Sequence, residues 1–184
     1  SVHKANVLRE SDGLFLEEVR RVAAGYPDVT YDEVLVDAMA ALLVRSPDRY
    51  DVIVTTNMFG DILSDLAAEL SGSLGLAASL NAGTDHAMAQ AQHGSAPDLA
   101  GRDLANPASL ILSAAMLLDW LGEKAHGDGF AAAARAIEQA VRSSLKDPAT
   151  RTPDLGGRAG TRAMAGAISQ AVLHAGQSGK SGRV

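Results

Sequence analysis

Two aspartates four residues apart, Asp61 and Asp65, are the strongest candidates for chemistry in this sequence. They follow the β-branched run 52–56, which predicts a strand, and they begin a segment with helical spacing of apolar residues. Two carboxylates on one helical face are suitable ligands for Mg²⁺ or Mn²⁺, and α/β proteins form ligand sites where parallel strands end. The alternative is structural, because the helix macrodipole favours acidic side chains in a first helical turn.

The string at 55–65, Thr-Thr-Asn-Met-Phe-Gly-Asp-Ile-Leu-Ser-Asp, favours the metal site. It resembles the metal-binding signature of the β-decarboxylating dehydrogenases, the family of isopropylmalate, isocitrate, homoisocitrate and tartrate or D-malate dehydrogenases. Four other stretches resemble the family in the same order: Lys-Ala-Asn-Val-Leu at 4–8, Val-Asp-Ala-Met at 36–39, His-Gly-Ser-Ala-Pro-Asp at 93–98 running to Asn106-Pro107, and Arg-Thr-Pro-Asp-Leu-Gly-Gly at 151–157, which looks like the family's C-terminal strand and turn.

The resemblance implies a fold and a reaction. The fold is α/β, the two-domain architecture of isocitrate and isopropylmalate dehydrogenases, here without its N-terminal half, where the family keeps substrate-clamping arginines and a catalytic tyrosine. The reaction is NAD-dependent oxidative decarboxylation of a 2-hydroxy-dicarboxylic acid such as 3-isopropylmalate, with a divalent metal stabilising the enolate that forms when CO₂ leaves. The alternative is a non-catalytic regulatory or assembly subunit that keeps the family fold.

The same resemblance gives roles to the residues of the first half. Asp61 and Asp65 become ligands of one Mg²⁺ or Mn²⁺, and Asp37 of the partner subunit completes the site, so the expected form is a homodimer with shared active sites. Lys4 matches the catalytic lysine, which would exchange a proton with the C2 hydroxyl when its pKa is lowered. Lys4 and Asp37 are therefore the expected catalytic residues.

A second set of residues is expected to bind NAD, although the Gly-x-Gly-x-x-Gly dinucleotide fingerprint is absent. The resemblance implies that the set comprises Asn6 on the nicotinamide side, His93, Gly94, Ser95 and Ala96 along the adenosine, Asp98 at its ribose, and Asn106 beside the adenine. A carboxylate at Asp98 would accept hydrogen bonds from the ribose hydroxyls and repel a 2′-phosphate, which predicts NAD in place of NADP. One departure is Gln90, where the family usually has a glutamate.

Alternating strand and helix patterns are expected to position these residues and predict α/β layers. The first half contains a helix capped by Ser11 or Asp12, a strand at 30–36, a helix at 38–45, a strand at 52–56 and a helix at 61–70. The second half contains a flexible connection or domain crossing at 71–83, an irregular segment at 93–106, helices at 107–121, 130–145 and 161–175, and a disordered tail at 177–184. We expect residues 1–71 to belong to a smaller dimer-forming domain and residues 72–184 to a larger cofactor-binding domain.

Composition excludes several other classes of protein. The net charge of −6 disfavours a nucleic-acid partner, and charged residues interrupt every apolar stretch before the ~20 residues of a membrane helix, so we expect no membrane association. Without cysteine the chain has no disulfide or thiolate site, which favours a cytoplasmic location. The remaining class of partner is a small molecule, here the 2-hydroxy-dicarboxylate.

Overall fold

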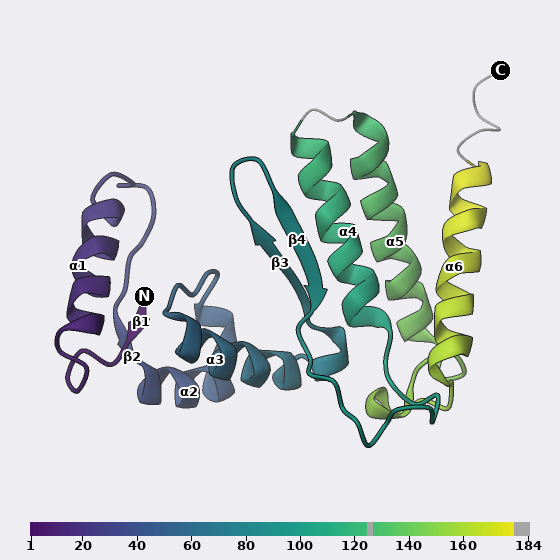
Figure 1. The fold of residues 1–184 in the computed structure, drawn as a ribbon, viewed down its shortest axis with the longest axis horizontal. Coiled ribbons are helices and arrows are strands. Elements are labelled where there is room, and N and C mark those ends of the chain that lie inside the picture. The colour runs from purple at the N-terminus through teal and green to yellow at the C-terminus, as the bar shows by residue number, and fades with distance from the viewer. Residues whose placement is uncertain (125–126, 179–184) are drawn as a thin grey trace. The chain divides into compact units, whose positions relative to one another are not determined.

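The computed structural model describes residues 1–124 and 127–178, which form two compact units, Ser1–Leu70 and the chain from Ser71 onwards (Figure 1). The elements of the first unit are β1 (Val2–His3), α1 (Ser11–Ala23), β2 (Val34–Leu35), α2 (Val36–Arg45), a 3₁₀ turn at Pro47–Arg49 and α3 (Asn57–Leu70). Those of the second unit are a 3₁₀ turn at Leu74–Leu76, β3 (Ala78–Ala82), β4 (Ala87–Ala91), α4 (Ala108–Glu123), α5 (Asp128–Lys146), a 3₁₀ turn at Pro153–Leu155 and α6 (Thr161–Ser178).

The core of the first unit lies between β1 and the two helices α2 and α3. β1 and β2 pair in parallel, with Val2 opposite Val34, and Val2 is buried together with Met39, Leu43 and Leu63. The apolar residues of α2 and α3 recur at helical spacing, so each helix turns one face toward this core. The predicted helices of this half are confirmed, although α1 begins after Glu10 without a side-chain cap, so the predicted cap by Ser11 or Asp12 was wrong.

The two strands predicted in the first unit were largely wrong. At 30–36 only Val34–Leu35 is a strand, and at 52–56 a single parallel bridge joins Thr55 to Val2. A β-branched run becomes a strand only where a neighbour offers a ladder of backbone partners. Among the described residues, Val2 supplies one backbone hydrogen bond, from its N–H to the Val54 carbonyl, and Val52 is left 87% exposed.

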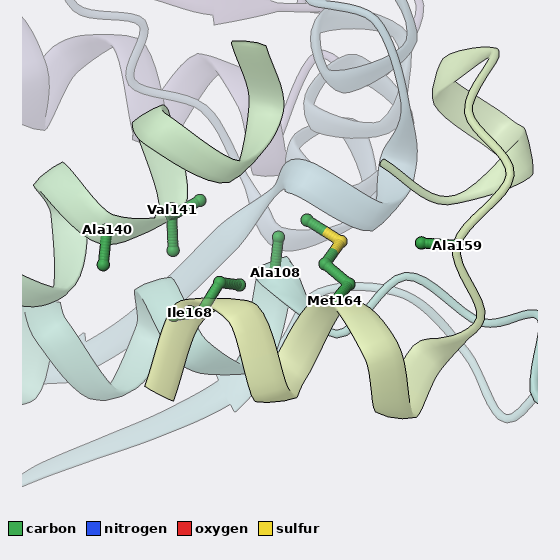
Figure 2. Close-up of a cluster of buried hydrophobic side chains, with 6 residues drawn as sticks. All are labelled: Ala108, Ala140, Val141, Ala159, Met164 and Ile168. Atoms are coloured by element: carbon green, nitrogen blue, oxygen red, sulfur yellow. The ribbon is translucent and has the colours of Figure 1, made fainter. Parts of the chain in front are cut away.

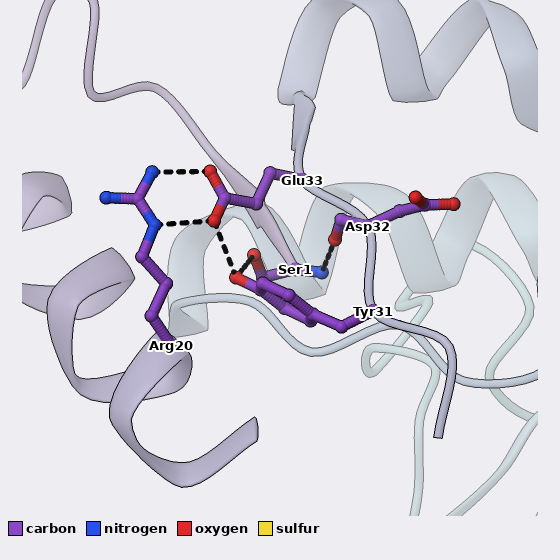
Figure 3. Close-up of polar contacts among 5 residues, drawn as sticks. All are labelled: Ser1, Arg20, Tyr31, Asp32 and Glu33. Carbon is purple, nitrogen blue, oxygen red and sulfur yellow. Dashed lines mark hydrogen bonds and ion pairs between the residues drawn. The ribbon is translucent and has the colours of Figure 1, made fainter. Parts of the chain in front are cut away.

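A polar network on the surface of the first unit joins α1 to the segment before β2 (Figure 3). The Arg20 guanidinium makes two hydrogen bonds of 2.6 Å to the Glu33 carboxylate, which also accepts from the Tyr31 hydroxyl. These hydrogen bonds lower the pKa of Glu33, with that from Arg20 the largest cause. The network fixes the return of the chain from α1 to β2.

In the second unit the antiparallel hairpin β3–β4 packs on α4, which packs on α5, and α6 lies against α5 (Figure 1). Its core joins α4, α5 and α6 (Figure 2). Met164 and Ala108 are fully buried there, beside Val141 and Ile168. The small side chain of Ala108 leaves room for Met164 between the helices, which is how close-packed interiors combine large and small residues.

Two serines attach the hairpin to α4. Ser109 and Ser113, one helical turn apart and both fully buried, donate to the carbonyls of Ala77 and Gln90 and accept the N–H groups of Gln92 and Ser79. Each buried hydroxyl is therefore satisfied by main-chain groups of the hairpin or of the residues that flank it, Ala77 and Gln92, as a buried polar group must be.

Several predictions for the second half need correction. Of the two alternatives for the segment 71–83, the flexible connection is wrong, because the segment contains the 3₁₀ turn at 74–76 and β3, and Ser73 is buried. The segment begins where the second compact unit begins, at Ser71. The stretch 151–157 forms a 3₁₀ turn in place of a strand, since its backbone bonds close locally from Leu155 to Thr152 and from Gly156 to Pro153. The helices and the irregular segment at 93–106 are confirmed. Helix α6 continues to Ser178, so the predicted disordered tail does not begin at 177. The remaining residues of that predicted tail, 179–184, lie outside the described residues.

No helix within 1–124 and 127–178 has both the length and the apolar character that crossing a bilayer needs.

Candidate functional site

Lys4 is held in place by a buried carboxylate. The chain leaves β1 at His3, and the Lys4 backbone N–H donates to Oδ2 of Asp12 at 2.6 Å. Asp12 lies in the first turn of α1 and is only 3% exposed. This hydrogen bond connects the start of the loop after β1 to the beginning of α1. Because it is made by the backbone N–H, it holds the Lys4 backbone in place and leaves the Lys4 side chain available for other contacts.

The Lys4 ammonium group lies against the carboxylate of Asp37, with Nζ 2.5 Å from Oδ1. Asp37 stands in the first turn of α2, directly after β2, and β2 pairs with β1. The parallel pairing of the two strands therefore brings residues 33 positions apart into contact. The hydrogen bond from Lys4 lowers the pKa of Asp37, so Asp37 is a carboxylate at neutral pH.

Asp61 and Asp65 project from α3 into solvent, one helical turn apart. α3 begins at Asn57, four residues earlier than predicted, and its first turn contains no acidic residue. The structural alternative, that these aspartates stabilise a helix start, is therefore wrong. Both side chains are exposed on one face of α3, where a ligand can reach them.

The aspartates of one chain do not complete a metal site. Within the described residues, no three His, Cys, Asp or Glu side chains come close enough together to hold an ion. The chain itself offers Asp61 and Asp65 as a pair, with Asp37 placed elsewhere beside Lys4. Oxygen donors of this kind fit Mg²⁺ or Mn²⁺, which bind few carboxylates and keep positions for other oxygen ligands.

The second unit contains a cavity of about 580 Å³ whose walls include most of the predicted cofactor residues. Its size lies within the usual range for small-molecule sites. The lining residues come from four segments: Ser73–Gly75, residues 93–96, 99–101 and 103–106 of the irregular segment, Asp154, and Thr161 and Arg162 at the start of α6. His93, Gly94, Ser95, Ala96 and Asn106 are all among them.

Two predicted cofactor residues lie outside this cavity. Asp98 is exposed on the same loop without lining the cavity, and Asn6 is an exposed residue of the first unit. The loop turns sharply at Ala96, whose φ of 39° is in the left-handed region. Three residues earlier in the same loop, the ring nitrogen Nδ1 of His93 lies 2.9 Å from the carbonyl oxygen of Gly94. This contact fixes the imidazole ring against its own loop.

Three polar side chains form a network in the cavity wall. Oδ2 of Asp154 accepts from the Ser73 hydroxyl at 2.5 Å and from Nδ2 of Asn106 at 2.9 Å. Oδ1 of Asn106 accepts the Ala108 N–H at 2.9 Å, at the start of α4. Burial raises the pKa of Asp154, but hydrogen bonds from Ser73, Thr152 and Asn106 outweigh it, so the net effect is a lowered pKa.

Another part of the cavity wall is formed where the irregular segment meets α6. The Asp103 carboxylate accepts the Arg162 N–H at 3.0 Å, its carbonyl accepts the Thr161 N–H, and the Thr161 hydroxyl donates to the Ala105 carbonyl. A side chain at Gly160 would overlap Asp103, so glycine permits this approach. Because Asp103 already accepts from the N-terminus of α6, that helix end is satisfied by the protein itself.

Sequence reasoning missed Ser73, Asp103, Asp154 and Arg162 as cavity residues. Asp154 belongs to the stretch 151–157 that had been singled out, but as part of a strand and turn. Ser73 fell in the supposed flexible connection. The available signal was weak: a serine beside a glycine-rich turn and an acid after a proline are typical of ordinary turns.

The comparisons with known proteins agree on one family. The family model described as "Isocitrate/isopropylmalate dehydrogenase" matches residues 1–171. The isocitrate/homoisocitrate dehydrogenase of Thermus thermophilus is 52% identical over 170 residues, which are 92% of this chain and 48% of that protein. The 3-isopropylmalate dehydrogenase of Methanothermobacter thermautotrophicus is 45% identical over 170 residues, 92% of this chain and 49% of that one.

Solved structures give the same result. Isocitrate dehydrogenase from Methylococcus capsulatus superposes with a TM-score of 0.86 at 50% identity, covering 93% of this chain and 49% of that one. A β-decarboxylating dehydrogenase from Thermococcus kodakarensis gives 0.75 at 43% identity, covering 94% and 48%. The predicted α/β fold class is confirmed, and the chain spans about half the length of the curated relatives it matches.

Proposed function

Because the chain belongs to the isocitrate/isopropylmalate dehydrogenase family, we propose that it supplies the NAD-binding and metal-binding parts of an enzyme that oxidatively decarboxylates a 2-hydroxy-dicarboxylic acid. The observation that carries this proposal is the cavity of the second unit, which gathers five of the seven predicted cofactor residues. These five were chosen from sequence alone, and they come from two separate stretches of the irregular segment.

In the first unit, the Lys4–Asp37 pair is proposed to handle the proton of the C2 hydroxyl. The Lys4 side chain is one-quarter exposed and its Nζ is hydrogen-bonded to a carboxylate, so it can pass a proton to or from a substrate oxygen while Asp37 holds its orientation. The buried Asp12 fixes the Lys4 backbone meanwhile. Asp61 and Asp65 would hold the divalent metal, which supplies Lewis-acid stabilisation of the negative charge formed as CO₂ leaves.

In the second unit, the cavity is proposed to take the adenosine half of NAD. Backbone groups of residues 93–96 and the small residues Gly94, Ser95 and Ala96 give it room for a flat base and a ribose. Asp98, exposed beside this loop, would accept the ribose hydroxyls and repel a 2′-phosphate. The cofactor is therefore proposed to be NAD and not NADP.

The substrate is proposed as a class: a 2-hydroxy acid with two carboxylates, such as 3-isopropylmalate. The relatives that match are named for isocitrate, homoisocitrate and 3-isopropylmalate, which share this chemistry and differ in the group attached to C3.

A homodimer is part of the proposal. Within the described residues of one chain, no third metal-binding side chain joins Asp61 and Asp65, so a third carboxylate would have to come from elsewhere. We assign it to Asp37 of the partner subunit. In a two-fold dimer each chain then gives and receives the same ligands. In a longer, active form of the protein, equal amounts of Lys4→Ala and Asp61→Asn copies should recover about a quarter of the original activity. Random exchange makes about half of the dimers heterodimers, and one of the two sites in each heterodimer stays intact. Demonstrated subunit exchange without activity would contradict shared sites.

The cofactor proposal is tested by calorimetric titration of the chain with ADP and with adenosine 2′,5′-bisphosphate. ADP should bind, and the 2′-phosphorylated ligand should bind at least about tenfold more weakly. Asp98→Asn removes the negative charge and should narrow this difference, whereas Asp119→Asn, an exposed aspartate of α4, should leave it unchanged. Equal binding of the two ligands by the unchanged chain would contradict the NAD assignment.

A further inference from the structure

The network of Ser73, Asn106 and Asp154 joins three segments that are far apart in the sequence. Ser73 precedes the first 3₁₀ turn of the second unit, Asn106 precedes α4, and Asp154 lies in the turn before α6. Both partners donate to the same oxygen of Asp154, over separations of 81 and 48 residues. All three side chains line the cavity.

Each donor in this network has a fixed direction. The Ser73 hydroxyl accepts the Gly75 N–H at 3.0 Å, and its single proton points to Asp154. Asn106 is 8% exposed, and its amide is engaged at both ends, with Oδ1 bound to the Ala108 N–H and Nδ2 bound to Asp154. Only an acceptor at position 154 satisfies both donors, and an ionised carboxylate makes the stronger hydrogen bonds.

The segments joined by the network are also in direct contact. A Cβ atom placed on Gly75 would lie 2.6 Å from Cβ of Asn106, so the turn at 74–76 rests against Asn106 with no space between them. A shift of Asn106 would therefore move the turn, and both form part of the cavity wall.

We propose that Asp154 is a positioning residue for the cofactor: through Asn106 and Ser73 it holds two walls of the cavity in the arrangement that receives the adenosine. This inference rests on the proposed function of the cavity. It adds that the site depends on a carboxylate that acts through its neighbours.

The test exchanges the carboxylate at position 154 and the amide at position 106. Asn106→Asp places a second carboxylate against Asp154, so the two repel each other and ADP affinity should fall at least about tenfold. Adding Asp154→Asn to that variant restores a donor and an acceptor in the reverse direction. The new amide at position 154 can then donate to the new carboxylate at position 106, which still accepts the Ala108 N–H. Asp154→Asn should therefore weaken ADP binding in the original chain and strengthen it in the Asn106→Asp chain.

ADP titration of the four chains, with circular dichroism and melting temperature to check folding, gives the result. Asp119→Asn is the control for loss of one negative charge in the same unit. If Asn106→Asp does not fold, Ser73→Ala replaces it: this change should weaken ADP binding in the original chain and have a smaller effect in a chain that already carries Asp154→Asn.

The outcomes separate this inference from the proposed function. Loss of binding in both single variants without recovery in the double variant would overturn the positioning role, because it would indicate direct contact of Asp154 or Asn106 with the ligand. Unchanged affinity in folded Asp154→Asn and Asn106→Asp chains would also overturn it and leave the proposed function intact. Absence of ADP binding by the original chain would overturn the proposed function, and this inference with it.

Discussion

Gly75→Ala should destabilise the second unit, because the new methyl group has no space. It would lie 2.6 Å from Cβ of Asn106, about 0.8 Å closer than the 3.4 Å at which ordinary contact begins, and 3.1 Å from Cγ and Nδ2 of the same side chain. Asn106 cannot rotate away without losing its hydrogen bonds to Asp154 and the Ala108 N–H. The backbone must therefore move, and such overpacking lowers the free energy of unfolding by about 1–3 kcal/mol.

The matched control is Gly94→Ala, another glycine that lines the cavity. An added Cβ at Gly94 meets nothing within 4 Å, and neither glycine has a positive φ, so the two substitutions differ mainly in the space available. For a chain of this length, about 2 kcal/mol corresponds to a fall of roughly 4–8 °C in the calorimetric melting temperature. We expect that fall for Gly75→Ala and little change for Gly94→Ala. Equal melting temperatures for the two variants would refute the reasoning.

The burial and charge of particular residues support three further predictions. Lys4→Ala removes the main cause of the lowered pKa of Asp37, so that pKa should rise toward its ordinary value in an NMR titration of the carboxyl carbon; an unchanged value would contradict the ion pair. Met164→Ala should lower the free energy of unfolding by about 2–5 kcal/mol, because Met164 is fully buried, whereas Met116→Ala, 39% exposed, should have a much smaller effect in denaturant titrations. Because folding lowers the pKa of Asp154, its contribution to stability is present above the ordinary value of 3.8 and is lost as the pH falls through the folded value. Asp154→Asn should therefore reduce stability more at neutral pH than at about pH 3, and an effect independent of pH would contradict this sign.

The helices could be predicted from the sequence because their evidence is local. Apolar spacing and the breakers Gly25 and Pro47 place α1 and α2 within a few residues of their observed ends. The strands could not be predicted as well, because pairing depends on a partner elsewhere in the chain. Val52 and Val54 have high β propensity, yet the described chain gives that run a single bridge, so propensity alone misled the prediction.

The residues of the candidate site also divide into those that local sequence patterns predict and those that they do not. His93 and Asn106 were chosen from short motifs and lie in one cavity, as the resemblance implied. Ser73 and Asp154 were not, because their significance comes from a hydrogen bond across 81 residues that no local pattern contains. The position of Asp61 within its helix was also predicted wrongly: the helix starts at Asn57, not at 61.

The attachment of the hairpin to α4 bears on how freely its sequence can change. Ser109 and Ser113 hold the hairpin through main-chain atoms, so the bond at position 90 goes to the carbonyl of Gln90 and would form with any residue there. The Gln90 side chain is itself exposed. Exchange between glutamate and glutamine at this position is therefore nearly neutral for folding.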